Sequence, residues 1–169
     1  PGESIALLSG ALPEADLPST WAALGAEHLR RGSAAAAIPP LQAALAAAPL
    51  HPDAPSWQAS IADAAWKRGR EEEEIIALEV LTRDFTTGSD WAASNPDTAA
   101  ATEAMVQSRM LRGIERLGRD LALAPPGTRA QRSDSLSRLL VAWLARYPDA
   151  PDNGSIHSLY GRWLLQHGR

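Results

Sequence analysis

The sequence contains no cysteine, no long apolar run and no basic block, and it has a single phenylalanine. The absence of cysteine excludes disulfide bonds and thiolate metal sites, and it fits either the cytoplasm or the periplasm. No apolar run reaches the roughly 18 residues that a membrane-spanning helix needs, and no signal peptide is visible. The formal net charge is −4, so we expect no nucleic-acid binding, because neutralising phosphates requires a cationic stripe.

Alanine is the most prominent residue, and six tryptophans supply much of the bulk that alanine lacks. Alanine has the highest helix propensity, whereas the β-branched and aromatic residues that favour strands are sparse. A chain of 169 residues has the length of one domain and can bury roughly 70% of its unfolded surface. The composition therefore predicts an all-α protein.

The most regular stretch of the chain, residues 21–49, reads WAALGAEHLRRGSAAAAIPPLQAALAAAP. Its spacing matches the signature Trp-x2-Leu-Gly-x2-Tyr, Ala-x3-Phe, Pro, with His28 and Leu41 at the Tyr and Phe positions. The stretch therefore resembles a tetratricopeptide repeat, which is a pair of antiparallel helices. In such a pair Gly25 and Ala37 would be small because the two helix backbones approach closely there.

Apolar spacing and turn residues predict the other helices. The predicted helices cover roughly 20–31, 34–48, 54–68, 71–85, 99–123, 129–146 and 155–169, with a short turn near Trp91 and, at 3–12, a short helix or the tail of an earlier repeat. The predicted N-caps are Ser19 or Thr20, Ser33, Asp53 and Thr98, and the predicted C-terminal glycines are Gly32 and Gly69.

Pro39 and Pro40 depart from the repeat pattern, because each removes an amide donor and clashes with the preceding turn of a helix. We expect either a kink at this pair or a helix that begins near Pro39.

The predicted fold is an α-solenoid of antiparallel helix pairs, a right-handed superhelix like that of tetratricopeptide proteins, with about seven to eight helices. A single domain, 1–169, would comprise the clearest repeat at 18–51, a second at 52–86, an irregular long pair at 98–147 and the first helix of a truncated repeat at 155–169. We therefore expect a fragment of a longer array, in which Leu159, Trp163 and Leu165 leave apolar surface bare.

The linker YPDAP at 147–151, followed by a helix that ends in Gly-Arg, is similar to the repeats of the barrel-assembly lipoproteins and Tol-system coordinators of bacterial outer membranes. The linker LHPDAP at 50–55 is much like YPDAP. The phrases DFTTGSDWAASNPD and ARYPDAPDNGS also resemble large tetratricopeptide proteins of gliding bacteria. These resemblances imply a periplasmic or outer-membrane-associated scaffold, with the cytoplasm as the alternative.

No pattern indicates catalysis, a cofactor or a metal site. The four histidines lack the i, i+4 spacing of a zinc-binding helix, and His28 occupies an inter-helix packing position. The acidic run 71–74 could contact a metal or a basic peptide, but a solvated helix start is the favoured interpretation. The row Arg109, Arg112, Arg116 and Arg119 could bind an acidic lipid, peptidoglycan or an acidic partner. Interleaved acids favour an ordinary solvated face there.

We therefore predict a non-catalytic scaffold that binds a protein or peptide in a groove formed by the first helices of its pairs. By analogy with the repeat family, the residues expected to line the groove are Ala22, Ala26, Arg30, Asp63, Trp66, Lys67, Arg162 and Gln166. Trp66 could equally pack on the next helix pair. The alternative is a helical region of a larger enzyme, either like a lytic transglycosylase or a repeat-bearing kinase, with its catalytic domain outside this segment. A cytoplasmic regulator with the same repeats is a third possibility.

Overall fold

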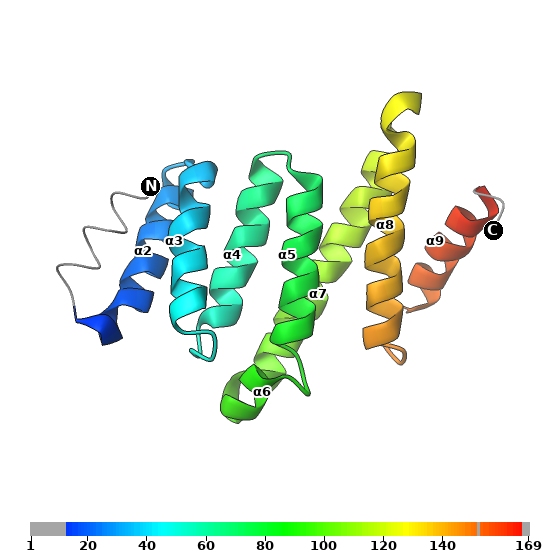
Figure 1. Cartoon of the computed structure of the whole chain (residues 1–169). Helices are drawn as coiled ribbons and strands as arrows, with labels where there is room; N and C mark the ends of the chain where they lie inside the picture. The colour runs from blue at the N-terminus through cyan, green and yellow to red at the C-terminus, as the bar shows by residue number, and fades with distance from the viewer. Residues whose placement is uncertain (1–12, 152, 167–169) are drawn as a thin grey trace. The chain divides into compact units, whose positions relative to one another are not determined.

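The computed structural model describes residues 13–151 and 153–166, and every regular element in that part of the chain is helical (Figure 1). It contains one short 3-10 helix, η1, and eight α-helices. Their bounds are η1 Glu14–Asp16, α2 Leu17–Arg30, α3 Ala34–Ala47, α4 Ala54–Lys67, α5 Glu71–Asp84, α6 Asp90–Ser94, α7 Pro96–Ala122, α8 Pro126–Arg146 and α9 Asn153–Gln166. The predicted all-helical class and helix number are confirmed, whereas the segment predicted at 3–12 lies outside the described residues.

The chain consists of two compact units, Pro1–Val106 and Gln107–Arg169. In the first unit α2 packs on α3, α3 on α4 and α4 on α5, so that two helix pairs stand side by side (Figure 1). In the second unit α9 packs on α8. Packing between helices that are adjacent in the chain is the arrangement that a solenoid uses.

The two helix pairs of the first unit turn in the same way. The turns after α2 and α4 contain Gly32 and Gly69, whose φ angles are +76° and +66°. Beyond each glycine the next amide donates to a carbonyl in the last turn of the preceding helix, from Ser33 to His28 at 2.8 Å and from Arg70 to Ala65 at 3.0 Å. The predicted glycine ends are confirmed, because a left-handed residue is needed to close a helix in this way.

Helices α2, α7 and α8 each begin three residues earlier than predicted, and α9 begins two residues earlier. Helix α2 starts at Leu17, so Pro18 lies in its first turn and neither Ser19 nor Thr20 is the N-cap. Helix α7 also starts before Thr98, which lies in its first turn. Proline is tolerated in the first turn because the amide that it lacks would have no partner in the helix, so Pro18, Pro96 and Pro126 can lie in the first turns of α2, α7 and α8.

Side-chain capping is less common than the sequence predicts. Ser33 and Asp53 occupy the N-cap positions of α3 and α4, but neither side chain accepts a capping hydrogen bond. Ser89 does cap the short helix α6, accepting from the amide of Ala92 at 3.1 Å. This confirms the predicted turn around Trp91 and gives it a defined start.

The proline pair lies inside α3. The helix begins at Ala34 and continues through Pro39 and Pro40 to Ala47, so the alternative that it begins near Pro39 is wrong. The two prolines fall in its second turn, where they remove only two of the helix hydrogen bonds.

The closest contact between α2 and α3 is at Gly25. A Cβ atom on this glycine would lie 2.6 Å from Cγ of Leu41 and 3.2 Å from the carbonyl oxygen of Ala37. Ala37 is fully buried and Leu41 is 1% exposed, so neither has room to move away. The prediction that Gly25 and Ala37 are small because the helices touch there is confirmed.

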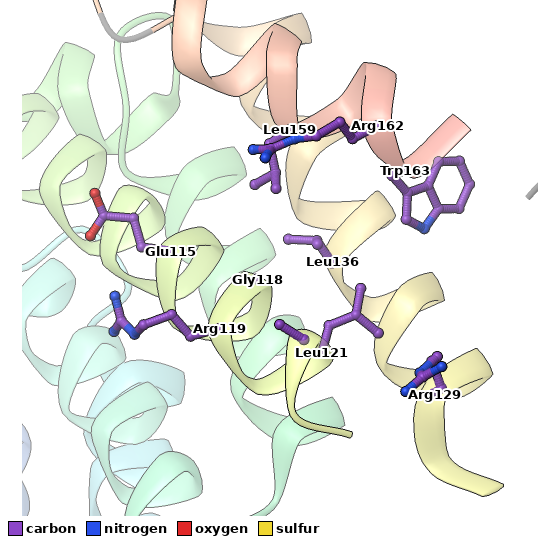
Figure 2. Close-up of a pocket in the computed structure, with 10 residues that line it drawn as sticks. Glu115, Gly118, Arg119, Leu121, Arg129, Leu136, Leu159, Arg162 and Trp163 are labelled. Carbon is purple, nitrogen blue, oxygen red and sulfur yellow. The ribbon is translucent and has the colours of Figure 1, made fainter. Parts of the chain in front are cut away.

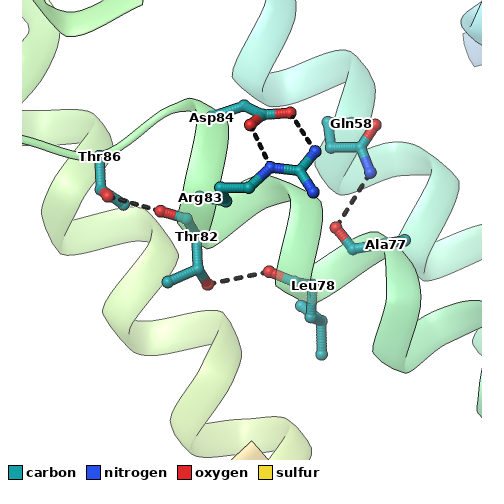
Figure 3. A network of polar contacts seen from close by, with 7 residues as sticks. All are labelled: Gln58, Ala77, Leu78, Thr82, Arg83, Asp84 and Thr86. Atoms are coloured by element: carbon teal, nitrogen blue, oxygen red, sulfur yellow. Dashed lines mark hydrogen bonds and ion pairs between the residues drawn. The ribbon is translucent and has the colours of Figure 1, made fainter. Parts of the chain in front are cut away.

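Three buried polar side chains of the first unit, those of Gln58, Thr82 and Thr86, donate to main-chain carbonyls (Figure 3). The amide of Gln58 on α4 donates to the carbonyl of Ala77 on α5 at 3.0 Å, and so links the two helices. Thr82 donates to the carbonyl of Leu78 at 2.8 Å, four residues earlier in the same helix. Burying such groups without a partner would be costly, so these bonds allow them inside an apolar core.

In the second unit, α7 and α8 each bury one apolar stripe. On α7 the predicted helical spacing is confirmed, since Met110, Ile114 and Leu117 are fully buried. On α8 the buried residues are Leu136, Leu139, Leu140 and Trp143.

The junction between α8 and α9 is built around Asn153, which is buried. Its amide oxygen accepts from the indole N–H of Trp143 at 2.8 Å. Its amide nitrogen donates to the carbonyls of Tyr147 at 2.7 Å and Pro148 at 2.5 Å. One side chain thus uses both its donors and its acceptor to fix the connection between two helices.

The expectation of a bare apolar face on α9 is wrong for Trp163, which is 5% exposed. Its indole N–H donates to the hydroxyl of Ser133 on α8. Leu159 is half-buried, and only Leu165, which is 83% exposed, extends into solvent as expected. The burial of Trp163 depends on the tertiary contact with Ser133 of α8, which the spacing of apolar residues within α9 cannot predict.

We predict opposite effects for the same substitution at two helical glycines. Gly25→Ala should destabilise the protein by about 1–2 kcal/mol, because overpacking against Leu41 outweighs the gain in helix propensity. Gly118→Ala should stabilise it by about 0.5–1 kcal/mol, because the new Cβ would make an ordinary contact at 3.7 Å with Leu159. Chemical denaturation of both variants measures the difference, and equal shifts would contradict the close contact at Gly25.

We also predict that Asn153→Asp destabilises the protein by about 2–4 kcal/mol at pH 7, although the shape of the side chain is preserved. The new carboxylate would keep the bond from Trp143 but would face two carbonyl oxygens without a donor. Asn95→Asp, at a half-buried asparagine, is the comparison variant and should cost less. Urea unfolding of the two variants measures this, and equal losses would show that the burial of Asn153 is unimportant.

Candidate functional site

The first helices of the two stacked pairs, α2 and α4, border a cleft of about 320 Å³, which we call the α2–α4 cleft. It is lined by Ser19, Ala22, Ala23, Ala26, Leu41, Asp53, Ser56, Trp57 and Ser60. Leu41 of α3 also lines the cleft, and its side chain occupies the space that a Cβ on Gly25 would fill.

Small side chains and hydroxyl groups dominate the α2–α4 cleft. The hydroxyl of Ser56 donates to the carbonyl of Asp53 at 2.7 Å, and that of Ser60 donates to the carbonyl of Ser56 at 2.8 Å. Their oxygen lone pairs remain able to accept from a ligand. Asp53 is the one ionisable residue in the lining, and its side chain is 70% exposed, so the cleft has negative charge at this end.

The connection that carries Asp53 is held in place by aromatic residues. His51 stacks on Trp57 with ring centroids 4.7 Å apart, and its Nδ1 accepts from the amide of Asp53 at 3.1 Å. The indole N–H of Trp91, which is 1% exposed, donates to the carbonyl of His51 at 2.8 Å. Helix α6 therefore supports the α2–α4 cleft through a residue that lies 40 positions away in the sequence.

Two of the predicted groove residues lie in this cleft and a third lies on the same helix. Ala22, 8% exposed, and the exposed Ala26 both line the cleft. Arg30 is exposed and is not in the lining; its guanidinium binds the carboxylate of Glu27 in two bonds of 2.7 Å. Hydrogen bonds from Arg30 and Arg31 lower the pKa of Glu27 to about 2, so this ion pair is formed throughout the neutral range.

The remaining predicted residues lie elsewhere. Asp63 is half-buried, Trp66 is 51% exposed and Lys67 is exposed; all three belong to the last half of α4 and none lines the α2–α4 cleft. Arg162 is on α9 in the second unit, and the side chain of Gln166 lies outside the described residues.

The second unit contains an open cleft of about 900 Å³ bordered by α7, α8 and α9, which we call the α7–α9 cleft (Figure 2). It is lined by Glu115, Gly118, Arg119, Leu121, Ala122, Arg129, Leu136, Leu159, Arg162 and Trp163. Arg162 is thus brought together with Arg119 of the predicted arginine row, and Arg129 joins them from α8.

The repeat period shows which signal the sequence reasoning missed. Helices α4 and α5 begin 37 residues after α2 and α3, at Ala54 against Leu17 and at Glu71 against Ala34. At this period the dipeptide Pro-Ser at 18–19 recurs at 55–56, and both serines line the α2–α4 cleft. A tetratricopeptide repeat has 34 residues, so alignment at that period conceals the recurrence.

No protein-family model matches the chain, and comparisons with curated proteins and with solved structures found no significant match. Within residues 13–151 and 153–166, each helix is too short or too polar to cross a lipid bilayer. No three His, Asp or Glu side chains in the same part of the chain lie close enough together to hold a metal ion. The function must therefore be inferred from the two clefts and the residues that line them.

We predict that Trp91→Phe loosens the connection at the α2–α4 cleft. The variant keeps a buried aromatic ring but removes the indole donor, so that the His51 carbonyl keeps only the amide of Ala54, and it should lose about 1–3 kcal/mol. Trp66→Phe, at a half-exposed position, should change stability by about 0.5 kcal/mol or less. Thermal unfolding measures both, and hydrogen exchange should show the amide of Asp53 less protected only in Trp91→Phe.

Proposed function

We propose that the protein is a non-catalytic scaffold that binds an extended peptide segment of a partner protein in the α2–α4 cleft. The observation that supports this proposal is the cleft between the first helices of two stacked pairs. Its lining includes Ala22 and Ala26, two of the residues predicted to line a groove. Stacked helix pairs generally use the surface formed by their first helices to hold peptides.

The chemistry of the lining supports an extended backbone as the ligand. Alanine at 22, 23 and 26 lets a main chain approach the surface of α2 closely, since no longer side chain projects there. The serine oxygens and the Asp53 carboxylate are acceptors, which match the N–H donors of a peptide. The negative charge of Asp53 favours a peptide with a Lys or Arg at that end.

The cellular setting that we propose, a bacterial envelope complex, is supported by the sequence of the linkers. YPDAP resembles the linkers of envelope scaffold proteins, and the similar LHPDAP contributes Asp53 to the cleft.

The test is to select peptides on the immobilised full chain from a random peptide library and to measure their affinity for two variants. Ala26→Trp places a large side chain in the cleft from an exposed position, and it should weaken binding at least about tenfold by excluding the peptide. Ala35→Trp makes the same change at an exposed site on α3 outside the lining, and it should leave the affinity unchanged.

Melting curves should show that both variants fold like the parent. Selected peptides that bind Ala26→Trp as tightly as they bind the parent would overturn the proposal, because their site would lie elsewhere.

A further inference from the structure

We propose that the α7–α9 cleft is a second binding site, and that its ligand is an acidic amphipathic helix of a partner protein. The proposal rests on three features of this cleft: its charge, its apolar floor and its open shape. It is independent of the α2–α4 cleft, because no residue is shared between the two linings.

The charge of the α7–α9 cleft is opposite to that of the whole chain. Its lining contains Arg119, Arg129 and Arg162 against one acid, Glu115, whereas the chain has a formal net charge of −4. All four of these side chains are exposed. Among the described residues, the side chains of Arg119 and Arg162 have no hydrogen-bond or ion-pair partner, so both guanidinium groups can bind an acidic ligand.

Arg129 is held at the border of the cleft by the main chain. Its guanidinium donates to the carbonyl of Ala124 at 3.0 Å, and the neighbouring Arg132 donates to the carbonyl of Asp120 at 3.1 Å. These bonds satisfy carbonyls at the C-terminal end of α7, which would otherwise lack partners. A guanidinium has five N–H donors, so Arg129 keeps donors for a carboxylate while its position is fixed.

The floor of the cleft is apolar. Leu136 of α8 is 1% exposed and Trp163 of α9 is 5% exposed, and the half-buried Leu121 and Leu159 flank Leu136 from the two other helices (Figure 2). Gly118 and Ala122 of α7 are small and leave space above this floor. A ligand that fills the space therefore needs apolar side chains in the middle and carboxylates at the edge.

The shape of the cleft decides between possible ligand classes. Sites for small molecules bury most of the ligand, whereas this cleft of about 900 Å³ is only partly enclosed. A membrane surface would require apolar residues that protrude from the lining, but Leu136 and Trp163 are recessed, and the exposed Leu123 and Leu165 do not belong to the lining. An amphipathic helix that lays one apolar face into a groove between helices fits both the recessed floor and the arginines around it.

The test measures fluorescence polarisation of a labelled peptide of about 18 residues, or five helical turns, with Leu at i, i+3, i+4 and i+7 and Glu on the other face. One control peptide has the same composition with the leucine pattern scrambled, and a second has Lys in place of Glu. We expect the full chain to bind the first peptide and neither control. Affinity should fall as salt rises from about 0.01 to about 0.15 M, because the Debye length shortens from about 30 to about 8 Å.

Variants of the chain then locate the site. The double variant Arg119→Glu, Arg162→Glu should weaken binding about tenfold. Glu115→Gln should strengthen it by roughly twofold, because it removes the one acid from the lining. Arg112→Glu is the matched control, since Arg112 is exposed on the same helix but does not line the cleft, and it should change the affinity by less than about twofold.

Four results would overturn the proposal. Equal weakening by Arg112→Glu and by the double variant would show that only general charge attracts the peptide. Equal binding of the scrambled peptide would show that the apolar floor has no role. Binding of phosphatidylglycerol vesicles but not of the peptide would assign the surface to a membrane. If the folded parent chain does not bind the acidic peptide, the cleft has no such ligand.

Discussion

The close approach of α2 and α3 at Gly25 determines how the first unit is built and where its cleft forms. A chain rich in alanine has few large side chains with which to fill a core, and protein interiors are densely packed, so its helices must lie close together. Gly25 permits this, because a Cβ there would lie 2.6 Å from Cγ of Leu41. Leu41 then passes beneath α2 and forms the floor of the α2–α4 cleft. The same residue, Leu41, therefore takes part both in the close packing at Gly25 and in the lining of the candidate site.

Tryptophan adds to this structure more than bulk. The indole N–H of Trp91 binds the connection between α3 and α4, and that of Trp143 binds Asn153 at the connection between α8 and α9. A third, from Trp163, binds Ser133 across those two helices. Each indole buries a large apolar surface and also satisfies a polar group. For Trp91 and Trp143 that group lies at a connection between helices, and for Trp163 it is a hydroxyl inside α8. A few such residues can therefore order connections in a chain whose alanines cannot.

The parts of the fold that depend on local sequence were predictable, and those that depend on distant contacts were not. The helix ends at Gly32 and Gly69 follow from the left-handed conformation that these turns require. The starts of α3, α4 and α5 were predicted correctly, whereas those of α2, α7 and α8 were predicted too late, because each of these three helices has a proline in its first turn. Helical spacing on α9 showed that Trp163 is part of an apolar stripe, but only the position of Ser133 on α8 determines that it is buried. Likewise Ala22 and Ala26 were found from the repeat pattern, whereas the serines of the cleft follow a 37-residue period that the pattern did not contain.

The charge of the α7–α9 cleft also depends on distant contacts and could not be predicted from local sequence. A row of arginines along one helix is most simply a solvated face, and the spacing on α7 alone supports no more than that. The cleft gains its positive charge because Arg129 and Arg162, from two other helices, join Arg119. Arg129 lies in the first turn of α8, where the helix dipole disfavours a cation. Its bond to the carbonyl of Ala124, beside the C-terminal end of α7, offsets this cost, because that end of a helix favours a positive charge. The antiparallel turn between α7 and α8 thus places a cation where one helix alone would not hold it, and the charge of the cleft is a property of the helix arrangement.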